Sequence, residues 1–249
     1  MRSTATWCLL TTLTGLSGAI YSITQLSIHM KAHDALYQQL ARMGQALASG
    51  PRLALLDLLR QGPRTVEALA QEVGLTLANA SQHLKVLRQA RLVEAEKRGI
   101  FVTYRVADQA VDDFYGALRG LAETRLAEVQ QIARAFVEKR SSLEPVDRHL
   151  LLERVRNGEV TVLDVRPPEE YRAAHIAGAL SVPLKELERH LGGLPKDREI
   201  VAYCRGPYCV LAPEAVELLR ARGYRAVALG DGVAEWRARG LPVTAGETP

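Results

Sequence analysis

Residues Val201–Val210 read VAYCRGPYCV and place a cysteine, Cys204, between an apolar run and a helix-like run. The apolar run enters from the N-terminal side, and the segment from Ala212 to Arg222 leaves with the spacing of a helix. A buried strand that passes through a short loop into a helix is typical of parallel α/β sheets, which hold ligands at such loops. Backbone N–H groups and a helix N-terminus should therefore surround the Cys204 sulfur and favour the thiolate, the reactive form of a thiol.

The residues after Cys204 supply the rest of the predicted site. Arg205 adds a positive charge, so we predict that the pKa of Cys204 lies below the free value of about 8.5. Cys209, five residues further on, could resolve a persulfide or form a disulfide; the alternative is a small buried residue at a helix start. Cys204 is the predicted nucleophile. The predicted substrate-binding groups are Arg205, Gly206, Pro207, Tyr208 and Cys209.

Apolar strand-like runs alternate with helical runs from Asp147 onward, which predicts a parallel α/β sheet. The predicted strands are Val160–Val165, Ile200–Tyr203 and Ala226–Leu229. The predicted helices are Glu169–Ala174, Leu184–Leu191, Ala212–Arg222 and Val233–Arg239.

Two motifs flank the cysteine loop: LDVRPPEEYRAAHIAGA at Leu163–Ala179 and LGDGVAEW at Leu229–Trp236. The three motifs, in this order, resemble a rhodanese domain, the sulfurtransferase module that carries sulfur as a cysteine persulfide. The resemblance implies a strand-end pair, Asp164 and Arg166, for which we predict a structural ion pair. The commonest thiosulfate-using pattern has glycine where Pro207 stands, which puts thiosulfate in doubt as the donor. Related phosphatases and arsenate reductases need an arginine where Val210 stands, which argues against those chemistries.

The middle of the chain predicts short helices followed by a hairpin. Helix-capping and helix-breaking residues mark the ends of these helices. The helices should begin at Ser49-Gly50-Pro51, after Thr65 and after Thr76. The last of them, Leu77–Gln89, should bury one face that contains Ala80, Leu84 and Leu87. Over Leu92–Val106 apolar residues recur at every second position instead, which predicts two strands joined by a turn at Lys97-Arg98-Gly99.

Helix–turn–helix followed by a hairpin is a winged helix, and NASQHLKVLRQARLVEAEKRGIFVTYRV (Asn79–Val106) resembles the ArsR-type family of bacterial winged-helix repressors. The resemblance covers residues 31–107 and implies binding to double-stranded operator DNA. Base-edge contacts are predicted for Asn79, Gln82 and His83, and phosphate contacts for Thr76, Ser81 and Lys85. Arg98 could enter a minor groove or touch a phosphate. The alternative is that these residues form the solvated surface of a helix and a turn.

The segment from Asp108 to Arg140 predicts one long helix with a wide apolar stripe. The stripe comprises Val111, Phe114, Leu118, Leu121, Val129, Ile132 and Phe136. A stripe of this kind favours pairing with a second copy of the chain, so we predict a homodimer. The alternative is a helix that lies on its own domain.

Composition narrows the class of protein. The chain has 249 residues, net charge +4 and 3 cysteines, too few for a disulfide framework, which fits a reducing, cytoplasmic setting. Relatives of the repressor family often bind metals through cysteines before the turn or through histidines in the last helix. Thr65–Gly74 has no cysteine, and Asp108–Arg140 has neither cysteine nor histidine. We therefore predict no metal and no other cofactor, and a sensing element in the rhodanese-like domain.

The N-terminal residues 3–28 carry no charged side chain, but serine, threonine and glycine dilute their hydrophobicity. We predict that translation starts at Met30, so that the protein does not associate with a membrane. The alternatives are that residues 1–29 form a disordered tail or a membrane anchor. The predicted domains are an extension 1–29, a winged-helix and dimerisation domain 30–140, a linker 141–146 and a rhodanese-like domain 147–249.

We interpret the chain as a DNA-binding transcriptional regulator that senses reactive sulfur, oxidant or a thiophilic species through Cys204. A small sulfur donor or thiol-reactive inducer is the predicted ligand. The alternative is an active sulfurtransferase that carries a persulfide on Cys204 and regulates its own synthesis by binding DNA.

Overall fold

A computed structural model describes residues 31–247, except 32, 100 and 139–147. The predicted extension 1–29 and linker 141–146 lie outside the described residues. The residues up to Arg52 and those from Leu53 onward form two units, which are described separately. The first unit contains a helix over residues 33–47. None of the helices in the described ranges is long and apolar enough to cross a membrane.

The predicted winged helix is confirmed, and its helices begin where the cap residues predict. The Thr65 and Thr76 hydroxyls accept the backbone N–H groups of Ala68 and Asn79, each at 3.3 Å. Gly74 ends the first of these helices in the left-handed region at φ +70°. A three-stranded antiparallel sheet in the order β1-β3-β2 completes the domain. Its elements are α2 (Gly50–Arg60), β1 (Arg64–Thr65), α3 (Val66–Val73), α4 (Leu77–Gln89), β2 (Val93–Arg98) and β3 (Phe101–Val106).

The turn of the hairpin is shorter than predicted. Lys97 pairs with Val102 and Arg98 pairs with Phe101, so both residues belong to the strand rather than to the turn. The reversal begins at Gly99, whose φ of +62° is a conformation that glycine adopts without steric cost.

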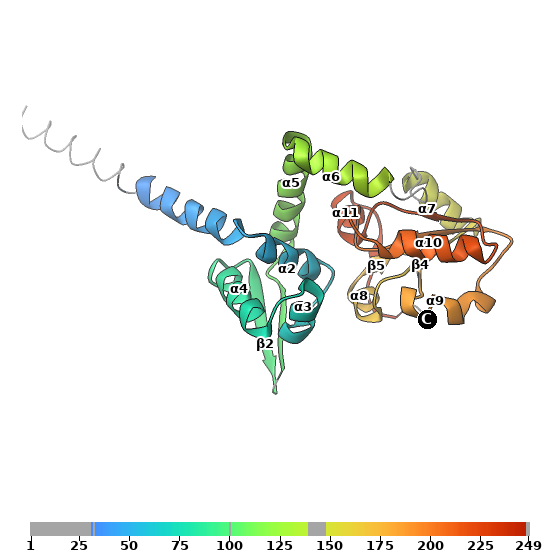
Figure 1. The fold of residues 1–249 in the computed structure, drawn as a ribbon, viewed down its shortest axis with the longest axis horizontal. Coiled ribbons are helices and arrows are strands. Elements are labelled where there is room, and N and C mark those ends of the chain that lie inside the picture. The colour runs from blue at the N-terminus through green and yellow to red at the C-terminus, as the bar shows by residue number, and fades with distance from the viewer. Residues whose placement is uncertain (1–30, 32, 100, 139–147, 248–249) are drawn as a thin grey trace, which may run out of the picture. The chain divides into compact units, whose positions relative to one another are not determined.

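The prediction of one long helix after the hairpin is wrong. The chain forms α5 (Gln109–Arg125) and α6 (Ala127–Glu138), which meet at an angle in Figure 1. Leu126 separates them with an extended backbone, φ −104° and ψ 111°. The Thr124 hydroxyl donates to the carbonyls of Gly120 and Leu121 at 3.0 Å. It therefore competes with the backbone N–H groups that these carbonyls bind in a continuous helix.

The predicted parallel α/β sheet is confirmed, with four strands in the order β6-β4-β7-β8. The predicted helix 184–191 is divided into 3₁₀ and α segments, and the short β5–β9 pair was not predicted. The elements are α7 (Arg148–Arg156), β4 (Val160–Asp164), α8 (Pro168–Ala173), β5 (His175–Ile176), β6 (Leu180–Ser181), η1 (Leu184–Glu186), α9 (Leu187–His190), η2 (Leu191–Gly193), β7 (Glu199–Tyr203), α10 (Leu211–Ala221), β8 (Ala226–Ala228), α11 (Val233–Ala238) and β9 (Val243–Thr244).

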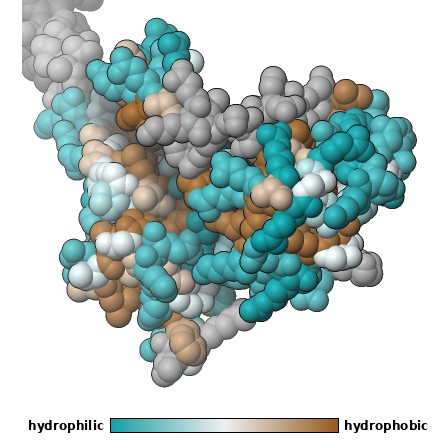
Figure 2. All heavy atoms as spheres, turned by 45° about the vertical axis from the view of Figure 1, so that its right-hand side comes forward, coloured by the Kyte–Doolittle hydropathy of each residue, from teal (hydrophilic) through white to brown (hydrophobic). Residues whose placement is uncertain are grey.

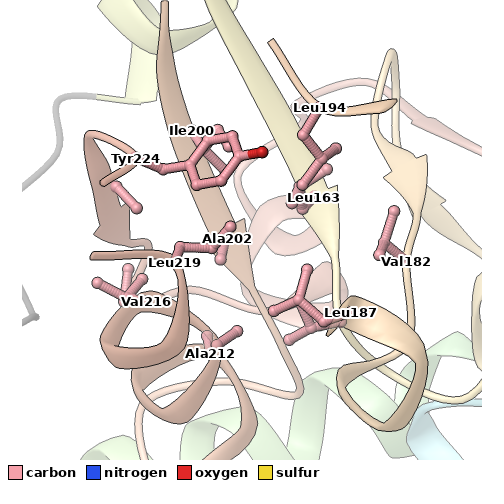
Figure 3. Packing of buried hydrophobic residues seen from close by; sticks show 14 of the residues in the cluster. Leu163, Val182, Leu187, Leu194, Ile200, Ala202, Ala212, Val216, Leu219 and Tyr224 are labelled. Atoms are coloured by element: carbon pink, nitrogen blue, oxygen red, sulfur yellow. The ribbon is translucent and has the colours of Figure 1, made fainter. Parts of the chain in front are cut away.

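Apolar side chains fill both faces of this sheet because successive residues of a strand point to opposite sides. Leu163 and Ile200 pack with Leu219 of α10 on one face (Figure 3). Val162 and Trp236 belong to the cluster on the other face, and Trp236 is fully buried. Burying one such aliphatic side chain contributes about 1.5–3 kcal/mol, so the two clusters hold the sheet as a rigid support for the loops at its edge. Figure 2 shows one face of the molecule, on which hydrophobic residues form patches among the hydrophilic ones.

Candidate functional site

Cys204 follows β7 at the carboxyl end of the sheet, and α10 begins after the loop that it opens. The residue is 2% exposed. Its sulfur accepts hydrogen bonds from the backbone N–H groups of Gly206 and Ala212. The loop therefore has the amide-lined form that the sequence pattern predicts.

Cys209 lies beside Cys204 and is half-buried. The two sulfurs share a hydrogen bond, and neither cysteine forms a disulfide. The backbone N–H groups of Arg205 and Leu211 donate to the Cys209 sulfur. The loop thus holds a pair of neighbouring thiols, each supported by two amides.

The charge within this pair is distributed differently from the prediction. Burial raises the pKa of Cys204 well above its usual value and outweighs the effect of the amides. The hydrogen bond from Cys204 lowers the pKa of Cys209 to about 6, against the opposing effect of burial. The predicted low pKa of Cys204 is therefore wrong, because a thiol with almost no solvent contact does not favour the charged form.

Arg205 is engaged with carboxylates rather than with the Cys204 sulfur. Its Nε and Nη2 donate to Glu170 at 2.5–3.2 Å, and Nη2 also donates to Glu72 at 2.7 Å. Glu170 is 1% exposed and also binds Arg64. The positive charge of Arg205 still lowers the pKa of Cys209, so its electrostatic effect reaches the second cysteine of the loop.

Other groups of the loop contact α11 of the same domain and the winged helix. Gly206 has φ +135°, and a side chain there would meet the Glu235 carboxylate at 3.1 Å. The Tyr208 hydroxyl donates to Glu123 of α5 at 2.6 Å. Burial and this hydrogen bond raise the pKa of Tyr208 to about 12. Gln61, which follows α2, donates to the Arg205 carbonyl at 3.4 Å.

A cavity of about 280 Å³ lies between the loop and the winged helix. Cys209 and Pro207 line it on the loop side, and Asp57 and Arg119 line it on the winged-helix side. Arg119 also donates to Glu235 at 2.6 Å. Sequence reasoning missed Asp57, Glu72, Arg119 and Glu123 because no local pattern distinguishes them from other charged residues on helix surfaces.

The predicted ion pair beneath the loop is confirmed. Arg166 Nη2 and Asp164 Oδ2 lie 2.6 Å apart, and both side chains are fully buried. The Tyr203 hydroxyl donates to Asp164 at 2.5 Å, which ties the end of β7 to the end of β4. Among the described residues, no group of three or more His, Cys, Asp and Glu side chains could hold a metal ion.

The predicted DNA-contacting residues lie on and around α4. Ala80, Leu84 and Leu87 of this helix are fully buried, as predicted, so the opposite face points outward. Four of the predicted residues are exposed and two are half-buried. The exposed ones are Thr76, Asn79, Gln82 and Lys85, and the half-buried ones are Ser81 and His83. Arg98 ends β2, and its side chain lies outside the described part of the structure.

Comparison with known proteins matches both parts of the chain. The model of the bacterial regulatory protein arsR family matches residues 50–95, and that of the rhodanese-like domain matches residues 147–239. The chain is 46% identical over 212 residues to the HTH-type transcriptional regulator Rv0324 of Mycobacterium tuberculosis, covering 85% of this chain and 93% of that protein. It is 33% identical over 104 residues to a sulfurtransferase of Allochromatium vinosum, covering 41% of this chain and 95% of that protein.

One similar solved structure is the crystal structure of a fragment, residues 1–100, of a possible transcriptional regulatory protein from Mycobacterium bovis. It is 44% identical, covers 36% of this chain and 96% of the fragment, and has a TM-score of 0.35. The long match to the mycobacterial regulator and the two family matches agree with the winged helix and the parallel sheet described above. The chain therefore belongs to the arsR family of bacterial regulatory proteins and carries a rhodanese-like domain in its C-terminal part.

Proposed function

We propose that this protein is a homodimeric regulator that binds operator DNA and senses reactive sulfur, an oxidant or a thiophilic species through Cys204 and Cys209. One observation carries the proposal: the loop that joins the two cysteines is one of the parts of the rhodanese-like domain that contact the winged helix. Arg205 reaches Glu72 at 2.7 Å, and Tyr208 reaches Glu123 at 2.6 Å. A chemical change at the thiols therefore acts directly on residues of the DNA-binding domain.

These contacts lead to two different parts of the winged helix. Glu72 lies in α3, immediately before the predicted recognition helix α4, and Glu123 lies in α5. A disulfide or persulfide in the loop would displace the backbone between the two cysteines and weaken both contacts. The linker 141–146 lies outside the described residues, and the contacts across the loop offer a route that does not depend on it.

The apolar surfaces of α5 and α6 support the homodimer. Phe114, Leu121, Leu126 and Ile132 are between 48% and 65% exposed, and large exposed apolar side chains mark interaction surfaces. Pairing through these helices would place two recognition helices about 34 Å apart, one turn of DNA. A stable monomer in sedimentation at micromolar concentration would contradict this assignment.

An active sulfurtransferase that regulates its own synthesis is the alternative. The two amides that support each sulfur favour it, because such groups stabilise the charge of a sulfur-transfer intermediate. Turnover distinguishes the two functions. Multiple rounds of transfer to cyanide or to a thiol acceptor would support the enzyme, whereas a single modification that changes DNA affinity supports the sensor.

Removing the contacts between the cysteine loop and the winged helix tests whether they carry the signal. Reactive sulfur should change the DNA affinity of the wild type by about 5–150-fold, the range of typical allosteric coupling. Cys204→Ser should abolish the response. A double variant, Glu72→Gln with Tyr208→Phe, should still react with sulfur but show almost no change in DNA affinity by fluorescence anisotropy.

The matched control is Glu188→Gln, which removes an exposed ion pair with Arg222 at 2.7 Å that does not involve the cysteine loop. This variant should respond like the wild type. A double variant that also responds like the wild type would show that the signal does not pass through Glu72 and Tyr208.

The DNA-binding surface gives a further prediction. Gln82→Ala and His83→Ala should each weaken operator binding more than binding to random DNA. A side chain that hydrogen-bonds a base edge contributes about 1–3 kcal/mol of discrimination against the wrong base. Lys85→Ala should weaken both and reduce the salt dependence, because a phosphate contact releases counterions irrespective of sequence. An unchanged ratio of operator to random binding in both the Gln82 and the His83 variants would show that the recognition surface is misassigned.

A further inference from the structure

Extending the proposed function, on which this step rests, we infer that the winged helix completes the sulfur site. Arg119 of α5 binds the anionic group of a small sulfur donor, and the bound donor passes its outer sulfur to Cys204. The sulfur therefore reacts in a site that both domains build, and the DNA-binding domain selects the class of donor.

Both domains line the cavity of about 280 Å³ beside the cysteine loop. Residues 205–211 form the loop side, and Asp57 and Leu58 of α2 and Arg119 of α5 form the winged-helix side. A molecule held in the cavity therefore lies against both domains. Pockets that hold drug-sized ligands have volumes of about 300–1,000 Å³, so this cavity suits a smaller molecule.

Cys204 lies directly behind the loop side of the cavity. It is 2% exposed, and its sulfur shares a hydrogen bond with the Cys209 sulfur and accepts the N–H group of Gly206. Cys209 and Gly206 both line the cavity. A small donor in the cavity therefore needs only a local opening of the loop to reach the Cys204 sulfur, whereas a protein that carries sulfur is too large to enter.

Arg119 retains a buried hydrogen-bond donor beside this cavity. Its Nη2 donates to Glu235 at 2.6 Å, whereas its Nε is buried and makes no hydrogen bond with any of the described residues. Glu123 Oε1 lies 3.4 Å from this Nε as an ion pair, without the geometry of a hydrogen bond. A buried donor on a charged group is costly when it lacks an acceptor. An oxygen atom of a ligand in the cavity would supply that acceptor.

Arg205, the other arginine in the cavity lining, is already occupied by carboxylates. Its Nε and Nη2 donate to Glu170 at 2.5–3.2 Å, and Nη2 also donates to Glu72 at 2.7 Å. Arg119 is therefore the cation that is better placed to take a new anionic partner. Asp57 adds a carboxyl group to the lining, which opposes a second negative charge on the ligand. The cavity thus fits a molecule with one anionic group.

The transfer balances without a further reactant. The donor is a hydropersulfide, R–S–SH, in which R carries the anionic group that Arg119 binds. The Cys204 sulfur attacks the outer sulfur, the S–S bond of the donor breaks, and RS⁻ leaves with the electron pair. The Cys204 proton passes to this leaving thiolate. The products are the persulfide Cys204–S–SH and the thiol RSH, so the sulfur changes its carrier and no oxidant is needed.

Thiosulfonate probes of different charge test the role of Arg119. Methyl methanethiosulfonate is neutral, its 2-sulfonatoethyl analogue is anionic, and its 2-trimethylammonioethyl analogue is cationic. Each probe transfers its outer sulfur group to a cysteine and releases methanesulfinate. The protein is the full chain with Cys8→Ser and Cys209→Ser, so that Cys204 is the reacting thiol. Mass spectrometry of the intact protein gives each rate, which is divided by the rate of the same probe with 2-mercaptoethanol.

On this normalised scale, the anionic probe should react at least about tenfold faster than the cationic probe, because Arg119 Nε donates to its sulfonate. Arg119→Gln should remove this preference and leave the rate of the neutral probe nearly unchanged. Arg119→Lys keeps the positive charge and should retain part of the preference. Arg222→Gln is the matched control: it removes an exposed ion pair with Glu188 and should leave all three rates unchanged.

Two results would overturn the role of Arg119. Equal normalised rates for the anionic and cationic probes in the protein that keeps Arg119 would show that the cavity does not select an anionic group. An equal fall of all three rates in Arg119→Gln would show that Arg119 supports the loop and does not bind the donor. The first comparison needs no substitution at Arg119, so it stands even if the variant does not fold.

A separate measurement distinguishes this step from the function that it extends. The protein with both Cys204 and Cys209 is exposed to the hydropersulfide of 3-mercaptopropionate, which carries one carboxylate, and its DNA affinity is measured. A preference for the anionic probe without any change in DNA affinity supports the role of Arg119 and overturns the sensing function. A change in DNA affinity without that preference overturns the role of Arg119, while the sensing function stands.

Discussion

Replacing Glu170 with alanine should lower the free energy of unfolding by about 3–5 kcal/mol, the cost of leaving buried charge without its partner. Glu170 is 1% exposed and lies where three guanidinium groups converge. It accepts hydrogen bonds from Arg64 and Arg205, and Arg166 Nη1 lies 3.8 Å away. Arg64 belongs to the winged helix and Arg205 to the cysteine loop, so one carboxylate compensates cations from both domains.

Urea denaturation of the full-length protein measures this effect. Glu170→Gln is the informative second variant, because it keeps the shape and part of the hydrogen bonding but removes the charge. Glu72→Gln is the control: Glu72 also binds Arg64 and Arg205, but its side chain is 28% exposed, so its loss should cost no more than about 1 kcal/mol. A Glu170→Ala variant as stable as Glu72→Gln would show that the buried network does not hold the two domains together.

Substitution of Glu170 should also weaken the effect of sulfur on DNA binding, because Glu170 holds Arg205 beside Glu72. Without it, Arg205 has one carboxylate partner fewer and the contact between loop and winged helix loses its fixed geometry. We expect Glu170→Gln to react with sulfur but to transmit a smaller change to DNA binding.

Much of the fold could be predicted because its signals are local. Thr76 caps α4, and the spacing of Ala80, Leu84 and Leu87 defines the buried face of that helix. The strands around Cys204 are continuous apolar runs, as expected for a parallel sheet buried on both faces. Each of these features depends on a few consecutive residues, so the sequence alone contains the information.

The features that were wrongly predicted depend on tertiary structure. Leu126 interrupts the helix without a glycine or proline, and a threonine such as Thr124 also occurs within unbroken helices, so it does not mark the break in the sequence. The pKa of Cys204 is raised because the folded protein buries it, which a loop pattern does not reveal. The contacts of Arg205 and Tyr208 with Glu72 and Glu123 join residues more than 80 positions apart, between two domains whose motifs are independent.

Gly232→Ala should slow sulfur uptake by about a hundredfold, since a misplacement of about 1 Å at a reacting group costs on this order. Gly232 precedes α11 at φ −101°, a backbone conformation that alanine adopts freely, so the effect is purely one of space. An added Cβ would lie 2.5 Å from the carbonyl carbon of Arg205 and 2.9 Å from the carbonyl oxygen of Cys204. These are backbone atoms of the cysteine loop, and they can yield only if the loop moves.

The start of α11 cannot easily move instead, because the Gly232 N–H donates to Glu235 at 2.9 Å and Glu235 binds Arg119 at 2.6 Å. Crowding of this kind also costs about 1–3 kcal/mol of stability. Gly230→Ala is the matched control in the same LGDG segment: a Cβ at Gly230 meets nothing within 4 Å. Mass spectrometry should find its sulfur uptake unchanged. Equal uptake rates in the two alanine variants would show that the position of the Cys204–Arg205 backbone does not govern the reactivity of the loop.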